Sequence, residues 1–201
     1  MKLAKLKKNR LAVLAAPQGN GAPVKLNLGS GPTKMTGFTS VDAIAFPGVD
    51  IVTDLRDKWP WEDDSVDEVH ASHFVEHLWH TPDRPERVHF ANELWRVLKM
   101  GAKATIICPH WSSCRAYGDF THAPNPVSEF WLFYLKREWR EVNAPHNDIK
   151  WNPKGYKCSF DATWGYSLEP ATSQRNQEYQ QFAMTYYVEA RQDIIATLVK
   201  C

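Results

Sequence analysis

Small and acidic residues that suit a nucleoside site stand directly after several apolar segments of this chain. Gly29, Ser30 and Gly31 follow the first segment, and Asp42 and Asp54 close the next two. A glycine turn lets a ligand approach the backbone closely, and a carboxylate at the end of a strand accepts hydrogen bonds from ribose hydroxyls. A second carboxylate can accept from the exocyclic amine of adenine. The pattern therefore favours a ligand that contains adenosine.

The same turn argues against a phosphate chain on that ligand. It lacks the third glycine of a dinucleotide fingerprint and the Gly-Lys-Ser/Thr of a Walker loop. No lysine or arginine follows the turn before Lys34. The missing cation favours an adenosyl ligand without phosphates.

The elements that must position these residues are predicted from hydrophobic periodicity and turn signals. Strands are expected at 24–28, 38–42, 49–54, 65–72, 102–109, 157–168 and 193–200, and helices at 85–99, 128–142 and 176–188. Strands that alternate with helices predict a mostly parallel α/β sheet, which binds ligands outside the carboxyl ends of its strands. The last strand is apolar on both faces, so it is expected to be central or covered.

Five motifs carry a resemblance to a known family: LNLGSG, SVD, VTDL, WPWEDDSVDEVHASHFVEHL and ELWRVLKMGAKATIICPH. In order and spacing they resemble the class I S-adenosylmethionine-dependent methyltransferases, most of all the small branch often labelled type 11. The resemblance runs from Val24 to His110 and more loosely to the C-terminus. It implies a Rossmann-like sheet of about seven strands with an antiparallel C-terminal strand, and S-adenosylmethionine as cofactor.

The resemblance also implies a role for eight residues. The glycine turn would wrap the methionine part, and its open backbone N–H groups would meet the carboxylate. Asp42 would hold the ribose, Asp54 and Leu55 would face the adenine, and His73 would lie beside the sulfonium. The eight expected cofactor-binding residues are Gly29, Ser30, Gly31, Asp42, Asp54, Leu55, Ser72 and His73.

One departure concerns the first crossover. Asp42 follows Gly31 by eleven positions, whereas about twenty are usual between a glycine turn and such an acid. A full helix does not fit in this interval, so the sequence predicts a crossover shortened to a turn.

The segment at about 110–147 is more than a cofactor-binding fold needs, and we interpret it as a substrate lid. Within it, His122 is the expected general base, because an imidazole titrates near neutral pH. Asp119, three positions earlier, is expected to orient that ring, with His110 as the reserve base. The competing interpretation is a surface loop whose Asp and Thr stabilise their own turn.

Two other functions were weighed. The string HFVEH is an inverted zincin signature, so a zinc hydrolase that uses His73, Glu76 and His77 is one alternative. We expect no metal, because the string directly follows a strand within an otherwise complete methyltransferase order. The second alternative is an RNA methyltransferase that uses a basic arm, which holds Lys2, Lys5, Lys7, Lys8 and Arg10.

The composition bears on the number of domains, the partners and the cellular compartment. The 201 residues, 43% of them hydrophobic, suit one domain from 24 to 201 behind a basic arm and linker at 1–23. The net charge of +1 favours no particular partner. The four cysteines show no CxxC spacing, which favours reduced thiols and the cytoplasm. The expected acceptor is a small molecule with a hydroxyl or an amine, and the choice between O- and N-methylation stays open, as does the oligomeric state.

Overall fold

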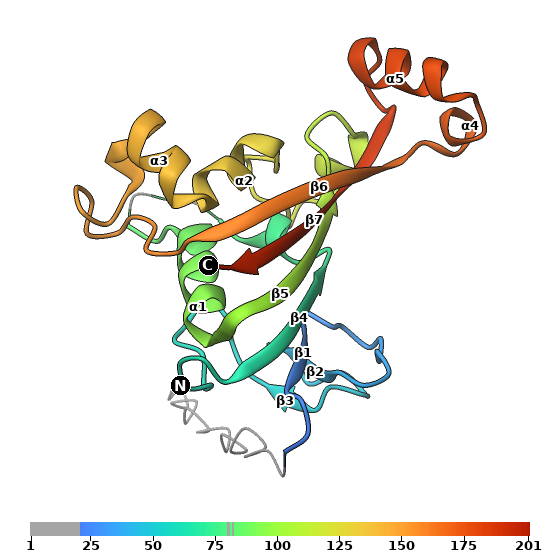
Figure 1. The fold of residues 1–201 in the computed structure, drawn as a ribbon. Coiled ribbons are helices and arrows are strands. Elements are labelled where there is room, and N and C mark those ends of the chain that lie inside the picture. The colour runs from blue at the N-terminus through green and yellow to red at the C-terminus, as the bar shows by residue number, and fades with distance from the viewer. Residues whose placement is uncertain (1–20, 80, 82) are drawn as a thin grey trace, which may run out of the picture.

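A seven-stranded sheet forms the centre of the protein (Figure 1). The structure is a computed structural model that describes residues 21–79, 81 and 83–201; the basic arm predicted in the first ten residues lies outside this part. In spatial order, the strands are β3 (Ile51–Val52), β2 (Thr39–Asp42), β1 (Lys25–Leu28), β4 (Val66–Ser72), β5 (Leu98–Pro109), β7 (Arg191–Lys200) and β6 (Phe160–Leu168).

The strand directions confirm the predicted fold class. Strands β1 to β5 pair in parallel, and β7 lies antiparallel between β5 and β6. The apolar strand β7 is therefore covered by a neighbour on each edge, as its sequence predicted. The parallel strands bring the carboxyl ends of β1, β2 and β4 to one edge of the sheet.

The first crossover is short, also as predicted. Residues 29–38, all of which the structure describes, form turns and no helix between β1 and β2. The Ser30 N–H donates to the Val41 carbonyl at 3.1 Å, which ties the turn to the neighbouring strand. Asp42 can thus follow Gly31 so closely because the chain returns to the sheet almost at once.

The helices differ from the sequence prediction in two places, at 128–142 and at a short helix over 170–173 that was not predicted. They are α1 (Glu86–Val97), α2 (Glu129–Leu135), α3 (Arg137–Asn143), α4 (Pro170–Ser173) and α5 (Gln177–Tyr186), with 3₁₀ turns η1 (Val75–His77), η2 (Cys114–Ala116) and η3 (Pro145–Asn147). The single helix predicted at 128–142 is wrong, because the chain breaks at Lys136, whose backbone is extended. An unbroken helix would need the Tyr134 carbonyl for its own ladder, but the Arg140 guanidinium donates to that oxygen at 2.6 Å.

One hydrophobic core joins the sheet, α1 and α2. Leu26, Val69 and Leu198 from the strands pack with Leu94 of α1 and Leu132 of α2, and all five are at most 1% exposed. Burial of each such side chain contributes about 1.5–3 kcal/mol. The segment predicted as a lid is therefore anchored in the core through α2.

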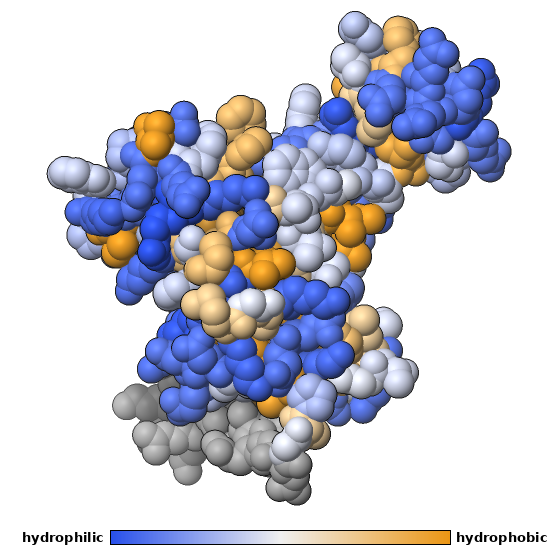
Figure 2. Space-filling model, in the orientation of Figure 1, coloured by the Kyte–Doolittle hydropathy of each residue, from blue (hydrophilic) through white to orange (hydrophobic). Residues whose placement is uncertain are grey.

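The α4–α5 segment stands clear of the main body beyond the ends of β6 and β7 (Figures 1 and 2). Phe182 and Tyr186 share one face of α5, with ring centroids 4.9 Å apart, but both are exposed. The four cysteines are free thiols. Within the described residues, no helix has the length and apolar character needed to span a membrane.

Candidate functional site

Two adjoining cavities open at the carboxyl ends of β1, β2 and β4. A cavity of about 480 Å³ is lined by Gly29, Gly31, Asp42, Asp54, Leu55 and His73, among others. A second, of about 420 Å³, is lined by Gly29, Ser30, Ser72 and His73, among others. Together the two cavities are lined by all eight residues that the resemblance assigned to the cofactor.

The glycine turn shows two different uses of glycine. Gly29 and Gly31 have φ angles of 64° and 53°, in the left-handed region that favours glycine. A Cβ on Gly29 would lie 2.4 Å from Cδ2 of Phe74, whereas a Cβ on Gly31 would have no neighbour within 4 Å. The expectation that both glycines make room for a ligand is corrected at Gly29, because the Phe74 ring occupies that space.

Asp42 is fixed by the backbone around it. Its Oδ2 accepts the Gly31 N–H and its Oδ1 accepts the Ile44 N–H, each at 2.9 Å. A carboxylate has about four acceptor sites, so lone pairs remain for ribose hydroxyls. The first acid is thus held rigidly at the edge of the larger cavity.

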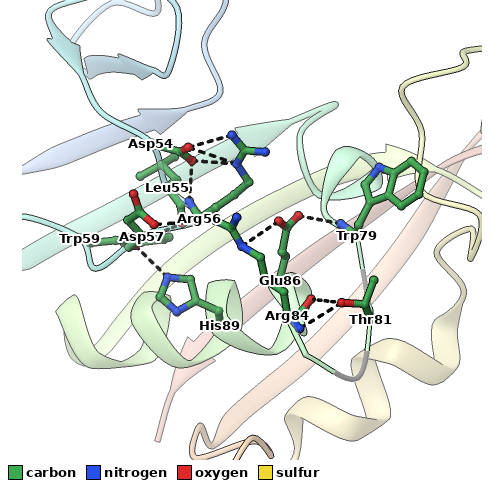
Figure 3. A network of polar contacts seen from close by, with 10 residues as sticks. All are labelled: Asp54, Leu55, Arg56, Asp57, Trp59, Trp79, Thr81, Arg84, Glu86 and His89. Carbon is green, nitrogen blue, oxygen red and sulfur yellow. Dashed lines mark hydrogen bonds and ion pairs between the residues drawn. The ribbon is translucent and has the colours of Figure 1, made fainter. Parts of the chain in front are cut away.

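Asp54 is held by a cation that the sequence analysis did not select. The Arg56 guanidinium donates two hydrogen bonds to the Asp54 carboxylate, from Nε to Oδ1 at 2.9 Å and from Nη2 to Oδ2 at 2.8 Å (Figure 3). This hydrogen-bonded guanidinium lowers the pKa of Asp54, so the carboxyl is ionised at neutral pH. An adenine amine at this position would share the carboxylate with Arg56.

Further polar contacts extend from this pair toward α1 (Figure 3). Arg84 lies 3.7 Å from an Asp57 carboxylate oxygen and 3.2 Å from one of Glu86. Glu86 in turn accepts the Trp79 N–H at 2.9 Å. These contacts connect the segment after β3 with the start of α1, and so support the loop that carries Asp54.

His73 lies at the junction of the two cavities in a strained conformation. Its φ is 53°, which costs free energy for a residue with a side chain. Its N–H donates to the Ile107 carbonyl at 2.8 Å, and its Nδ1 lies 3.2 Å from Glu76 Oε1. That carboxylate raises the pKa of His73. Backbone strain that persists at a cavity is typical of a binding site.

His110, the reserve base, has both ring nitrogens engaged. Its Nδ1 accepts the Ser112 N–H at 3.1 Å, so Nε2 carries the proton and donates to Glu129 Oε1 at 3.1 Å. Glu129 also accepts from the Tyr166 hydroxyl at 2.6 Å. The buried ring has no free lone pair, so it is a poor base and a good positioning group. The sequence analysis missed Glu129 and Tyr166, since no local pattern indicates their contact.

The predicted pairing of Asp119 with His122 is wrong. Asp119 Oδ1 accepts from the Thr121 N–H at 2.8 Å and from its hydroxyl at 2.7 Å, as in the competing interpretation of a self-stabilised turn. His122 Nδ1 instead lies 3.2 Å from the Ala116 carbonyl oxygen. The same Thr121 hydroxyl lies 3.0 Å from His77 Nδ1, so Asp119 acts on His77 through Thr121.

His77 and His122 nevertheless meet beside the larger cavity. Their ring centroids are 4.8 Å apart in an edge-to-face arrangement, and His77 lines that cavity. The Ala123 N–H donates to the Glu76 carbonyl at 2.7 Å and holds the two segments in register. The predicted lid thus places His122, but not His110, next to the larger cavity.

Comparisons with known proteins indicate which fold this is. No protein-family model and no curated protein matches the sequence. Among solved structures, a SAM-dependent methyltransferase from Archaeoglobus fulgidus is similar with a TM-score of 0.58 and 17% identity, covering 90% of this chain and 87% of the other. The 1,6-didemethyltoxoflavin-N1-methyltransferase of Burkholderia thailandensis is similar with a TM-score of 0.52 and 13% identity, covering 90% and 72%. The chain therefore has the class I methyltransferase fold.

Proposed function

We propose that this chain, which has the fold of the class I methyltransferases, binds S-adenosylmethionine and transfers its methyl group to a small-molecule acceptor. The observation that carries the proposal is the pair of joined cavities lined by all eight residues of the predicted cofactor set. An adenosyl group needs a carboxylate for the ribose and another for the adenine, and Asp42 and Asp54 stand at the ends of adjacent strands.

The cofactor supplies a methyl group on a sulfonium, which is already a good leaving group. The chain's own residues would therefore work mainly by alignment. The turn at Gly31 would lie beside the methionine end, with its Ser30 and Gly31 N–H groups already donated to the Val41 carbonyl and to Asp42. Asp42 and Asp54 would fix the nucleoside. His73, at the junction of the cavities, marks the end at which an acceptor would meet the methyl group.

The proposed acceptor class is supported by the polar side chains around that junction. The Burkholderia thailandensis enzyme named above was solved with bound 1,6-didemethyltoxoflavin and S-adenosylhomocysteine. The histidines here, His73, His77 and His122, suit an acceptor that donates or accepts hydrogen bonds. We infer a metabolite with a hydroxyl or an amine.

The zinc-hydrolase alternative requires an α-helix that carries both histidines of the signature, and the described residues 73–77 contain no such helix. The inverted zincin signature needs its two histidines on one α-helix, but residues 75–77 form a single 3₁₀ turn and His73 lies before it. The RNA alternative depends on the basic arm, which lies outside the described residues. The RNA alternative therefore stays a prediction that these residues do not test, and the small-molecule proposal rests on the two joined cavities.

The test is calorimetric titration with S-adenosylmethionine and S-adenosylhomocysteine. Replacement of Asp54 by alanine should weaken both by roughly 10- to 100-fold, since a hydrogen bond to a charged group contributes about 1.5–3 kcal/mol. Asp161→Ala is the matched control, because this exposed carboxylate on β6 contacts only Lys136 at 3.3 Å among the described residues. Absence of binding to the unaltered protein, or equal losses in the two variants, would reject the proposal.

A further inference from the structure

Three potential metal ligands converge beside the larger cavity. Glu76 and His77 come from the 3₁₀ turn η1, and His122 comes from the loop after η2. One ligand atom from each residue lies within 4.8 Å of those of the other two. His122 lies outside the HFVEH string, 45 positions after His77, so that string does not indicate this ligand set.

The hydrogen bonds of His77 fix which of its nitrogens carries the proton. The Thr121 hydroxyl must donate its one hydrogen to Asp119, because an ionised carboxylate only accepts. Its oxygen can then only accept from His77, 3.0 Å away, so Nδ1 of His77 is protonated. The lone pair of neutral His77 is therefore on Nε2.

The same logic applies to His122. Its Nδ1 lies 3.2 Å from the Ala116 carbonyl oxygen, which accepts and cannot donate. Nδ1 of His122 is therefore the protonated nitrogen, and Nε2 keeps its lone pair. Metal-binding histidines are typically fixed in this way, with the other ring nitrogen donating to a carboxylate or a carbonyl.

Glu76 is buried without adequate partners. Its side chain is 4% exposed, and neither carboxylate oxygen makes a hydrogen bond with a described residue. His73 Nδ1 lies 3.2 Å from Oε1, an ion pair that leaves Oε2 unpartnered. A buried carboxylate costs several kcal/mol unless a cation or hydrogen-bond donors compensate it. His73 and the buried Arg87, which interacts with the Glu76 charge, supply part of that compensation. A bound cation would supply the rest.

We propose that Glu76, His77 and His122 bind one divalent transition metal ion, most favourably Zn²⁺. Two imidazole nitrogens and one carboxylate are a ligand set of catalytic zinc sites, in which the fourth position stays open for water or substrate. Asp119 and Thr121 orient His77 from behind, and the Ala116 carbonyl orients His122. The Asp119–Thr121 turn would then position a metal ligand as well as stabilise itself.

The consequence for the reaction rests on the proposed function. Because His77 lines the cofactor cavity, an ion on this residue is placed to bind an oxygen of the acceptor at its open position and to polarise it. In this arrangement His122 is a ligand, and not the free base that the sequence suggested.

The experiment uses the full chain, stripped with a chelator and titrated with ZnCl₂, with bound metal also measured by elemental analysis. We expect one zinc ion per chain and at least a 100-fold weaker affinity in Glu76→Gln and in His122→Ala. Thr121→Val, which removes only the orienting hydroxyl, should weaken binding by about 10- to 100-fold. His89→Ala is the control, since this half-buried histidine contacts the Asp57 carbonyl at 2.8 Å and should leave zinc affinity unchanged.

The outcomes separate this proposal from the methyltransferase proposal. Each variant is checked by circular dichroism, and His122→Ala should still bind S-adenosylhomocysteine. Cofactor binding with no zinc binding would overturn the metal site alone, and zinc binding with no cofactor binding would overturn the methyltransferase function alone. An equal loss of zinc affinity in His89→Ala would also overturn the assignment of these ligands.

Discussion

Gly29 and Gly31 share a left-handed backbone but differ in their surroundings. An alanine at either position incurs about 1–2 kcal/mol of backbone strain. At Gly29 the new Cβ would also meet Phe74 at 2.4 Å, and overpacking adds about 1–3 kcal/mol. We expect Gly29→Ala to lower the free energy of unfolding clearly more than Gly31→Ala, as measured by urea denaturation.

A second replacement tests the cause of that difference. Phe74→Ala removes the ring, so adding Gly29→Ala to it should cost only the backbone strain. The two effects are then non-additive, as contacting residues generally are. If Gly29→Ala and Gly31→Ala lower the free energy of unfolding equally in the unaltered background, the Phe74 ring moves aside and its close approach to Gly29 does not destabilise the variant.

The residues at the strand ends were predictable because their signal is local. An apolar run followed by Gly29-Ser30-Gly31, or by Asp42, reports both the strand and the residue at its end. Contacts between distant segments leave no such signal. Glu129 meets Tyr166 across 37 positions and His77 meets Thr121 across 44, and neither spacing follows from a helical or strand period. The residues that line the two cavities were therefore accessible from sequence, while the partners of the histidines were not.

Three elements are connected by the buried contact of His110 with Glu129 and Tyr166. These residues belong to the end of β5, to α2 and to β6. Hydrogen bonds, that from His110 first, lower the pKa of Glu129 from its ordinary 4.5 to about 2. The folded state therefore favours the ionised carboxyl. Its stabilisation is complete above about pH 4.5 and is lost as the pH falls toward 2.

Glu129→Gln removes this titration and keeps the shape of the side chain. At pH 7 we expect the variant to be less stable by about 1.5–3 kcal/mol, the contribution of a hydrogen bond to a charged group. The difference between the two proteins should shrink between pH 4.5 and 2. Urea denaturation over this pH range measures it, with the exposed Glu178→Gln as control. A difference that stays constant with pH would contradict the assigned cause.

Secondary structure itself was predictable at the level of elements but not of every boundary. The alternating apolar residues of β1 and β4, the continuous apolar run of β7 and the 3.6-residue period of α1 identified these elements correctly. The break between α2 and α3 was not predictable, because it depends on Arg140 reaching the Tyr134 carbonyl. A side chain that competes for a backbone acceptor leaves the hydrophobic period unchanged, so periodicity alone predicts a continuous helix.

On the scale of the whole molecule, the segment around α2 and α3 is joined to the sheet by a buried ion pair. Arg140 donates to Asp148 Oδ2 through Nε at 2.9 Å and to the Cys158 carbonyl through Nη2 at 3.1 Å. The side chains of Arg140 and Asp148 are 0% and 3% exposed. One guanidinium thus connects α3, the segment after η3 and the approach to β6. The segment and the sheet are expected to unfold together.

Arg140→Met tests this connection. It leaves Asp148 as an uncompensated buried charge, so we expect a loss of about 3–5 kcal/mol in the free energy of unfolding. Adding Asp148→Leu removes that charge and should recover part of the loss, since a well-packed apolar pair often replaces a buried ion pair at little cost. Urea denaturation followed both by tryptophan fluorescence and by circular dichroism should give coincident transitions in every variant. If fluorescence changes first while the circular dichroism of the sheet persists, the segment at about 110–147 unfolds independently, and Arg140 stabilises only that segment.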